Sequence, residues 1–448
     1  MTATSSRLIS YSLWLLGIWV LISFWSMNLP GASAGTFNPE TINTWDTAWM
    51  LISTALVMLM TPAVWFFYGG MVSSKNIVSV LKQSILILSI VSIQWVLFGY
   101  SLVFGTDVWG IIGGMNFFWL RGVGFAPNAD YAATIPHLAF MMFQGMFAIV
   151  TPALIIWAIV ERINLKALII FVLFWTTLVY DPIAHWVWGV GGWLRVYGAL
   201  DFAGGTVVHM SAWFSALAAA MLVGKRINQG HPGNIANNLP FIILWAALLW
   251  FGWFGFNAGS AVASGALAAS AFVVTNTAAA AAALAWMFLS WAETGKPSAM
   301  AAAIGAVCGL VVITPASWYV GPLSSVAMGL IGGVLTYMSV YLRTKKIKID
   351  DTLDVWAAHG MGGLFGALLT WVFAEKAINS AGADGALFGN PHLLIIQLWT
   401  VCVTWLYAFF ATIILLKVIG LFMPLRVSSS DEKEGLDMAT HGEVGFRF

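Results

Sequence analysis

Two histidines lie inside long apolar stretches, where an ionisable side chain is expensive to keep. His209 follows Asp201 in the stretch Asp201-Phe-Ala-Gly-Gly-Thr-Val-Val-His209, at a spacing of roughly 12 Å if this segment is helical. The second, His359, lies in Asp354-Val-Trp-Ala-Ala-His359-Gly-Met-Gly-Gly363. A neutral imidazole offers one donor and one acceptor. A lone buried histidine is more often a satisfied core residue, but two such rings predict a proton relay or a conduction path.

Three groups of aromatic residues stand beside glycine and polar residues. They are Phe143-Gln-Gly-Met-Phe147, His185-Trp-Val-Trp188 and Gly252-Trp-Phe-Gly-Phe256-Asn-Ala-Gly-Ser260. Aromatic faces attract a cation by about 0.5–2 kcal/mol, and a serine hydroxyl can accept a hydrogen bond from an N–H donor. These groups therefore predict a vestibule for a small cation. The alternative for any one of these residues is ordinary aromatic core, and most of the 25 tryptophans are expected in the interfacial belts.

Asp201 has two compatible interpretations. Its carboxylate can cap a helix by accepting hydrogen bonds from the free N–H groups at Gly204 or nearby. It can also be a fixed negative charge at the entrance, which favours cation entry without touching the substrate. We expect both.

Composition places these groups in a polytopic membrane protein. The 448 residues are 60% hydrophobic and only 8% charged, against about 25% charge in a soluble domain. The net charge of +1 indicates no nucleic-acid partner. Cys308 and Cys402 lie in apolar stretches and are expected to be free. The sequence has no GxSxG elbow, phosphate loop, HExxH or CxxC, so we expect no enzyme activity, no metal site and no cofactor.

The first 34 residues have the pattern of a signal peptide, with Arg7, an apolar middle and a small-residue site at Ala32-Ser33-Ala34. The alternative is an uncleaved first helix. Residues 35–421 form the expected membrane domain of eleven helices, and residues 422–448 form a C-terminal tail. The eleven apolar spans cover approximately residues 47–70, 78–104, 136–160, 167–191, 203–224, 238–259, 262–293, 299–316, 321–342, 354–374 and 394–421.

The distribution of basic residues predicts the orientation. With the amino terminus outside after cleavage, the carboxyl terminus is inside. The loops then placed outside hold only Arg121, Arg195 and Lys376. Those placed inside hold Lys75, Lys82, Arg162, Lys166, Lys225, Arg226, Lys296, Arg343, Lys345, Lys346 and Lys348, as the positive-inside rule requires.

The spans also show a faint internal symmetry. Five spans end in one that carries Asp, paired Gly and His, from Asp201 to His209, and five more end in a similar one, from Asp354 to Gly363. An odd number of spans per half predicts two inverted five-helix repeats plus one further helix. Inverted repeats commonly place a transport site near the midplane of the membrane.

Together, these motifs resemble the ammonium transporter family (Amt/Mep), which is related to the Rhesus proteins. The shared motifs are Phe66-Phe-Tyr-Gly-Gly70 with Lys75-Asn76, Phe143 to Phe147, Ala158-Ile-Val-Glu161-Arg162, Asp201 to His209, Gly252 to Ser260, Thr314-Pro-Ala and Asp354 to Gly363. The resemblance covers nearly the whole chain. It implies a homotrimer in the cell (inner) membrane, with a pore through each subunit and the C-terminus in the cytoplasm.

The resemblance also assigns roles to individual residues. Trp188, Phe147 and Ser260 would form an outer ammonium site, with Trp253 nearby, and Phe147 and Phe256 would close the pore. His209 and His359 would be the twin histidines of the path for ammonium or ammonia, with methylammonium as an analogue. Asp201 would be the carboxylate near the entrance. Thr314 and Phe143 would line the pore.

The tail from Gly435 to Phe446 resembles the family's regulatory segment, on which a trimeric PII signalling protein acts. The chain ends in Gly445-Phe-Arg-Phe448 where an Ala-Tyr-like pair is expected, so the alternative is a solvated tail. Two other functions stay open: an ammonium sensor with little flux, and a Rhesus-like neutral gas channel.

Overall fold

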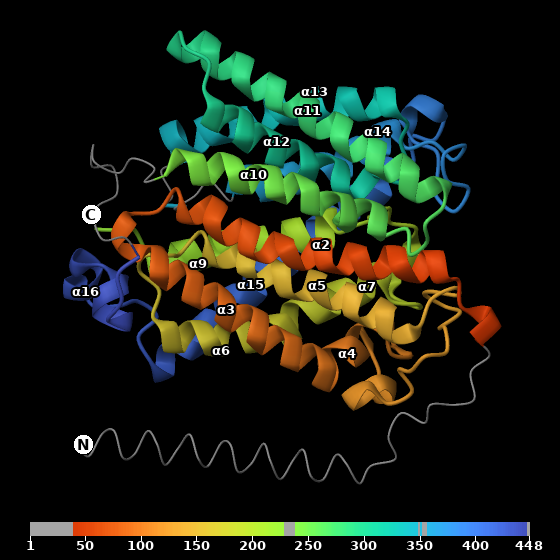
Figure 1. The fold of residues 1–448 in the computed structure, drawn as a ribbon, viewed down its shortest axis with the longest axis horizontal. Helices are drawn as coiled ribbons and strands as arrows, with labels where there is room; N and C mark the ends of the chain where they lie inside the picture. Colours follow the sequence, from red (N-terminus) through yellow and green to blue (C-terminus); the bar gives the residue numbers. More distant parts are fainter. Residues whose placement is uncertain (1–38, 228–237, 348–349, 352–355, 446–448) are drawn as a thin grey trace.

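In the computed structural model, the described residues are mostly helical, with loops and one short hairpin between the helices (Figure 1). The structure describes residues 39–227, 238–347, 350–351 and 356–445. The expected signal peptide at residues 1–34 lies outside the described residues, as do Asp354 and Phe446.

Among the described residues, ten helical segments are long and apolar enough to cross a membrane. They are Thr44–Gly69, Ser74–Phe104, His137–Ile156, Leu165–Tyr197, Gly205–Val223, Leu239–Ala258, Ala266–Thr294, Ala299–Ala316, Pro322–Lys346 and Leu393–Phe422. The span predicted at residues 354–374 corresponds to a shorter apolar helix, Ala358–Phe373. A multi-pass helical membrane protein is therefore confirmed, while the count of eleven spans and the inverted relation of the two halves stay predictions.

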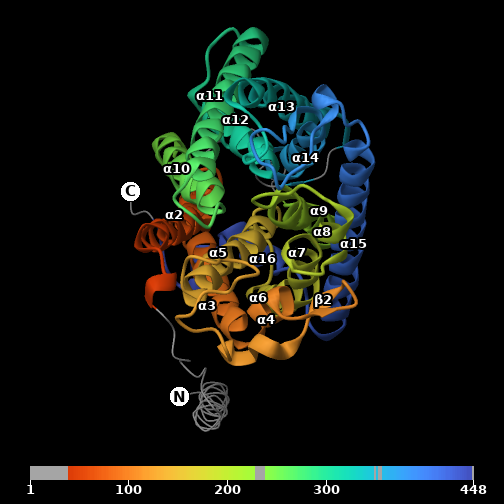
Figure 2. The same cartoon turned by 90° about the vertical axis from the view of Figure 1, so that its right-hand side faces the viewer.

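The helices form two groups with one long helix beside both. The first group comprises α2 (Thr44–Gly69), α3 (Ile77–Gln94), α4 (Tyr100–Phe104), α5 (His137–Ile156), α6 (Leu165–Trp175), α7 (Asp181–Trp188), α8 (Trp193–Tyr197) and α9 (Ser211–Val223). The second comprises α10 (Leu239–Trp253), α11 (Ala266–Thr294), α12 (Ala299–Ile313), α13 (Pro322–Leu342) and α14 (Gly362–Phe373). In the end-on view, α15 (Leu393–Phe422) runs along one side of the molecule past both groups (Figure 2).

Single π-helical turns lie within or at the ends of several helices. The turns relevant to the site are η6 (Gly205–Met210), η7 (Phe254–Ala258) and η10 (Trp356–Met361). His209 lies on η6 and His359 on η10, so the two histidines occupy the same kind of irregular turn. Such turns often occur at functional sites, because the extra residue redirects side chains without ending the helix.

Small residues allow α11, α12 and α13 to approach closely. A Cβ atom added at Gly329 would lie 2.3 Å from the Ala278 carbonyl oxygen, and one at Gly309 would lie 2.5 Å from the same atom. The alanine-rich stretch from Thr277 to Ala283 is thus packing surface. Among the described residues, neither Cys308, on α12, nor Cys402 forms a disulfide.

The described part of the C-terminal tail packs on the ends of the helices. The Val427 N–H donates to the Arg162 carbonyl at 3.0 Å, and the Leu436 N–H donates to Asn76 Oδ1 at 2.8 Å. Lys82 Nζ lies 3.0 Å from Glu443 Oε1. The tail carries the short helix α16 (Ser429–Glu434), which Ser428 caps. Through residue 445 the tail is therefore docked on the helix bundle.

Buried ion pairs join this face of the molecule. Arg226 donates to Glu161 Oε2 at 2.7 Å and to both oxygens of Asp350, with Nη2 2.8 Å from Oδ1. Burial by itself would raise the pKa of Asp350, but the hydrogen bonds and charge of Arg226, with Arg162, lower it. The cluster links segments before α6, after α9 and before η10, so three distant parts of the sequence depend on one guanidinium.

Arg226→Met is expected to lower the free energy of unfolding by about 3–5 kcal/mol, because it removes the cation that hydrogen-bonds the buried carboxylates of Glu161 and Asp350. Thermal unfolding in detergent would measure the loss. The difference in unfolding free energy between the variant and the wild type should be largest at neutral pH. It should shrink as the pH falls below 3.8, the ordinary pKa of an aspartate, because the pKa of Asp350 is lowered in the folded state. Arg121→Met, at an exposed arginine, is the control. An equal melting temperature for Arg226→Met and Arg121→Met would contradict the assigned role.

Candidate functional site

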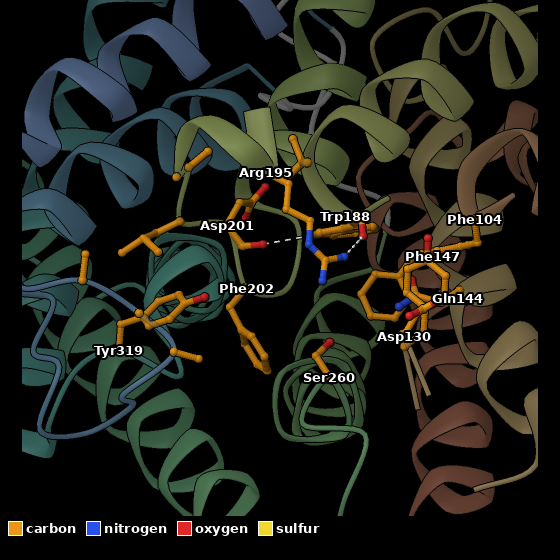
Figure 3. Close-up of a pocket in the computed structure, with 18 of the residues that line it drawn as sticks. Phe104, Asp130, Gln144, Phe147, Trp188, Arg195, Asp201, Phe202, Ser260 and Tyr319 are labelled. Carbon is orange, nitrogen blue, oxygen red and sulfur yellow. Dashed lines mark hydrogen bonds between the residues drawn. The ribbon is translucent and has the colours of Figure 1, made fainter. Parts of the chain in front are cut away.

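A cavity of about 520 Å³ opens at one end of the helix bundle (Figure 3). Its wall includes Phe147 from α5, Trp188 from α7, Asp201 and Ser260. Phe147, Trp188 and Ser260 come from different spans and were predicted to form an outer cation site. Asp201 was predicted near its entrance. The remaining lining residues are Phe104, Asp130, Tyr131, Phe140, Gln144, Val187, Arg195, Gly198, Ala199, Leu200, Phe202, Tyr319, Ala381, Gly382 and Ala383.

The aromatic wall of the cavity is held by ring contacts and hydrogen bonds. The rings of Phe147 and Trp188 meet edge to face, with centroids 5.8 Å apart at 87°. The Trp188 indole N–H donates to the Asp201 carbonyl at 2.9 Å. Ser260 Oγ donates to the Phe256 carbonyl at 2.8 Å, so its lone pairs are left to accept a hydrogen bond from a ligand. This arrangement can hold a small N–H cation against a π face.

The cavity carries charges of both signs. Asp130 and Asp201 line it together with Arg195, which lies near Trp188 in the close-up (Figure 3). The Arg195 guanidinium donates to the Trp188 carbonyl at 2.6 Å. The loop between Trp188 and Asp201 therefore places a cation on the wall of the cavity.

Two phenylalanines separate the cavity from the interior. The ring centroids of Phe147 and Phe256 are 4.4 Å apart, at an angle of 42°, and both side chains are buried. Phe143 packs against Phe147 with centroids 5.0 Å apart. The structure places Phe143 behind the ring pair, outside the residues that line the cavity.

Beneath the ring pair, the two histidines lie in contact. His209 Nδ1 and His359 Nδ1 are 3.3 Å apart, and the rings are nearly parallel, at 21°. Both side chains are 2% exposed. His359 Nε2 lies 2.9 Å from the Tyr68 hydroxyl, whereas His209 Nε2 has no hydrogen-bond partner among the described residues.

This contact admits two proton arrangements, because one Nδ1 must donate while the other accepts. If Tyr68 donates to His359 Nε2, then His359 Nδ1 carries the proton and donates to His209, whose Nε2 then also carries a proton. If Tyr68 accepts, then His359 Nε2 carries the proton, His209 Nδ1 donates to His359 Nδ1, and His209 Nε2 carries no proton. The three side chains can therefore exchange a proton by a concerted shift along one hydrogen-bonded line.

Glycines make the histidine contact possible. Gly204, in the left-handed region at φ +105°, begins η6. A Cβ atom at Gly363 would lie 2.7 Å from the Gly205 carbonyl oxygen and 3.1 Å from His209 Cβ. A Cβ atom at Gly360 would lie 1.8 Å from the Trp213 ring. Only residues without a side chain let η6 and the segment around η10 approach this closely.

Asp201 supplies the acceptors that the start of η6 requires. Its Oδ1 accepts from the N–H groups of Gly204 (3.1 Å) and Gly205 (2.6 Å), and Oδ2 accepts from those of Thr206 (2.8 Å) and Val207 (3.1 Å). The Thr206 hydroxyl also donates to Oδ2. Asp201 borders the cavity, and the residue is 5% exposed. The predicted capping hydrogen bonds are thus present, while a role in ion entry stays a prediction.

Trp253, which the resemblance places near the outer site, lies beside the histidines. It does not line the outer cavity; its ring stacks on His209, with centroids 5.5 Å apart at 16°. Its N–H donates to Thr314 Oγ1 at 2.9 Å, and Asn257 lies 3.3 Å from the same hydroxyl. Trp253 therefore forms a wall beside the histidines, and Thr314 orients Trp253.

Sequence reasoning missed two positions close to the histidines. Tyr68 is 291 residues from His359, so no local spacing signals their contact, although Tyr68 stands in the Phe66-Phe-Tyr-Gly-Gly70 motif. Trp356 packs on Trp213, with centroids 5.4 Å apart, beside a second cavity of about 140 Å³ on the other side of the histidines. The histidines thus lie between two hollows.

Comparison with known proteins identifies relatives over nearly the whole chain. The family described as "Ammonium Transporter Family" matches residues 48–446. The chain is 45% identical over 402 residues to the "Ammonium transporter" of Bacillus subtilis, covering 90% of this chain and 98% of that protein. It is 47% identical over 401 residues to "Ammonium transporter Amt1" of Archaeoglobus fulgidus, with 90% and 99% covered.

Solved structures show the same fold. The crystal structure of Candida albicans Mep2 matches with a TM-score of 0.81 and 34% identity, covering 88% of each chain. A structure titled "Sensor Amt Protein" matches with a TM-score of 0.81 and 31% identity, covering 89% of this chain and 98% of that one.

Asp201→Ala is expected to lower the free energy of unfolding by at least about 3 kcal/mol, because it leaves four buried backbone N–H groups without an acceptor, at about 1–3 kcal/mol for each. Asp201→Asn, which keeps one carbonyl oxygen, should fall between the wild type and the alanine variant in a thermal unfolding experiment. The control is Asp130→Ala, at an exposed carboxylate on the same cavity. Equal stability of the two alanine variants would show that the carboxylate does not hold η6.

Proposed function

The chain belongs to the ammonium transporter family, and we propose that it moves ammonium across the cytoplasmic membrane by separating the proton from ammonia. The observation that carries this proposal is the contact between His209 and His359, which lies behind a closed pair of phenylalanine rings and beneath an aromatic cavity. Homologues named as ammonium transporters support the substrate.

Ammonium binds first in the outer cavity. Trp188 and Phe147 present aromatic faces to the cation, and the free lone pairs of Ser260 accept one of its N–H groups. A potassium ion of similar size gains the cation–π attraction but can donate no hydrogen bond. The cavity therefore concentrates ammonium, and its selectivity depends on the later loss of a proton.

The apolar path beyond Phe147 and Phe256 excludes a bare cation. Moving a charged group into such surroundings costs several kcal/mol even after relaxation, and both rings are almost fully buried. Neutral ammonia avoids most of this cost. Ammonium therefore gives up its proton at the outer site, and ammonia passes between the rings when they move apart.

His209 and His359 offer polar contacts to ammonia inside the pore. The unpartnered Nε2 of His209 can hydrogen-bond the passing molecule. The line from His209 through His359 to Tyr68 can also carry the proton, which makes transport electrogenic. If the proton stays outside, transport is neutral.

The family membership also supports assembly and location. We propose a homotrimer in the inner membrane, with the amino terminus outside and the C-terminus in the cytoplasm, where the docked tail can meet a PII protein.

A second function, an ammonium sensor with little flux, is favoured by the similarity to the protein titled "Sensor Amt Protein". Uptake of methylammonium by cells that express this chain separates transport from sensing, because a sensor without flux accumulates none.

His209→Ala and His359→Ala are each expected to lower the ratio of ammonium flux to potassium flux by about tenfold, which corresponds to about 1.4 kcal/mol. The reason is the loss of the polar contacts that replace water around ammonia. Flux is measured in proteoliposomes with an internal pH dye and a potassium-sensitive dye, together with ammonium-evoked current.

The matched control is His392→Ala, at an exposed histidine that begins α15. If both pore variants transport as the wild type does and still exclude potassium, the histidines are not part of the path. Ammonia uptake by the wild type without any current would remove the electrogenic form of the mechanism.

A further inference from the structure

His185 is a fully buried histidine outside the path described above. It lies on α7, one turn before Trp188, with 0% exposure. Its Nδ1 lies 2.7 Å from the Val103 carbonyl oxygen, and its Nε2 lies 2.9 Å from Asp107 Oδ1. Both ring nitrogens therefore have a close oxygen partner.

The chemistry of these partners determines the protonation of the ring. A backbone carbonyl can only accept, so Nδ1 must carry a proton. An ionised carboxylate can also only accept, so Nε2 must carry one as well. The hydrogen bond from His185, with that from the Gly110 N–H, lowers the pKa of Asp107 although burial opposes the shift. A histidine that donates from both nitrogens is an imidazolium cation.

The carboxylate is presented by the only hairpin among the described residues. Strand β1 (Asp107–Val108) pairs with β2 (Ile112–Gly113). Inside the connecting turn, the Gly110 N–H donates to both oxygens of Asp107, at 2.8 and 3.0 Å. The Asp107 side chain is 31% exposed, so the ion pair has one buried member and one member in reach of external solvent.

The hairpin is fastened to both ends of the segment that carries Trp188. The Trp186 indole donates to the Ile111 carbonyl at 2.7 Å, and the Trp193 N–H donates to the Gly110 carbonyl at 3.2 Å. The turn between them fits closely around the ion pair. A Cβ atom at Gly191, where φ is +91°, would lie 2.5 Å from Asp107 Cβ, and one at Gly189 would lie 2.3 Å from His185 Nδ1.

We propose that His185 is a charged positioning residue, which through its ion pair with Asp107 fixes α7 and so holds Trp188 in the outer ammonium site. Trp188 follows His185 by three residues on the same short helix, and its indole N–H and carbonyl oxygen both make hydrogen bonds across the cavity wall. This inference rests on the proposed function of the outer cavity. The substrate does not touch His185.

One consequence is a dependence on external pH. Loss of the Nε2 proton removes the hydrogen bond to Asp107 and leaves the carboxylate facing a neutral ring, so the hairpin loosens and affinity for ammonium falls at alkaline pH. The other titratable or charged groups around this ion pair are Tyr131, which accepts from the Val190 N–H at 2.9 Å, and Arg195 and Asp130. Burial raises the pKa of Tyr131 above its ordinary value.

The charge can be tested without transport. The full-length protein, labelled with ¹⁵N-histidine in lipid, is examined by solid-state NMR at neutral pH. Among the seven histidines, the signal of His185 is the one lost in His185→Gln. We expect both of its ring nitrogens to carry protons. A single protonated nitrogen would overturn the proposal.

The positioning role is tested by methylammonium uptake over a range of external pH, at a constant concentration of the protonated substrate. Asp107→Asn removes the charge that stabilises the imidazolium, so the alkaline rise in KM should begin at a lower pH than in the wild type. Vmax should change little, because the ring pair and the twin histidines are untouched. Asp384→Asn, at a carboxylate that accepts from the Lys376 N–H, is the matched control.

The two experiments fail separately. An unchanged KM profile in Asp107→Asn, with melting temperature equal to the wild type, would show that the ion pair does not position Trp188. No uptake by the wild type itself would refute the proposed function instead, while the NMR result would still decide whether His185 is charged.

Discussion

The contact between His209 and His359 is the interaction on which the rest of the structure depends. It brings together two π-helical turns from segments 150 residues apart, at a separation that a single added Cβ atom at Gly363 or Gly360 would prevent. Two imidazoles that touch at Nδ1 in an apolar interior must share one proton between them. The selectivity of the proposed mechanism follows from this contact, because a path with fixed polar atoms but no fixed counter-charge favours a neutral hydrogen-bonding molecule over a cation.

Polar groups inside the bundle are supported by chains of hydrogen bonds. Asp201 satisfies the backbone at the start of η6, and Thr314 orients Trp253, which stacks on His209. Without water, each unsatisfied polar group costs several kcal/mol. The irregular turns that aim the histidines therefore persist because side chains replace the hydrogen bonds that a regular helix would make for itself.

Ion pairs hold the two ends of the bundle. At one end, Asp107 and His185 fasten the hairpin to α7, beside the aromatic cavity. At the other, Arg226 joins Glu161 and Asp350 under the docked tail. All three pairs involve chain segments outside the long helices. Charge therefore joins segments that the apolar packing between helices does not hold.

The sequence alone determined the class of the protein and most of the groups at its site. Continuous apolar stretches of about 20 residues cross a bilayer as helices, since a helix satisfies its own backbone polar groups there. Type and spacing were therefore enough to predict the spans and to single out His209, His359, Asp201, Trp188 and Ser260. The tertiary structure decided what no spacing encodes. It placed Trp253 beside His209 and not in the outer cavity, brought Tyr68 to His359, and gave His185 two acceptors. These contacts join residues from different helices, and their geometry depends on how closely the helices pack and where each π-helical turn rotates a side chain, which are properties of the assembled bundle.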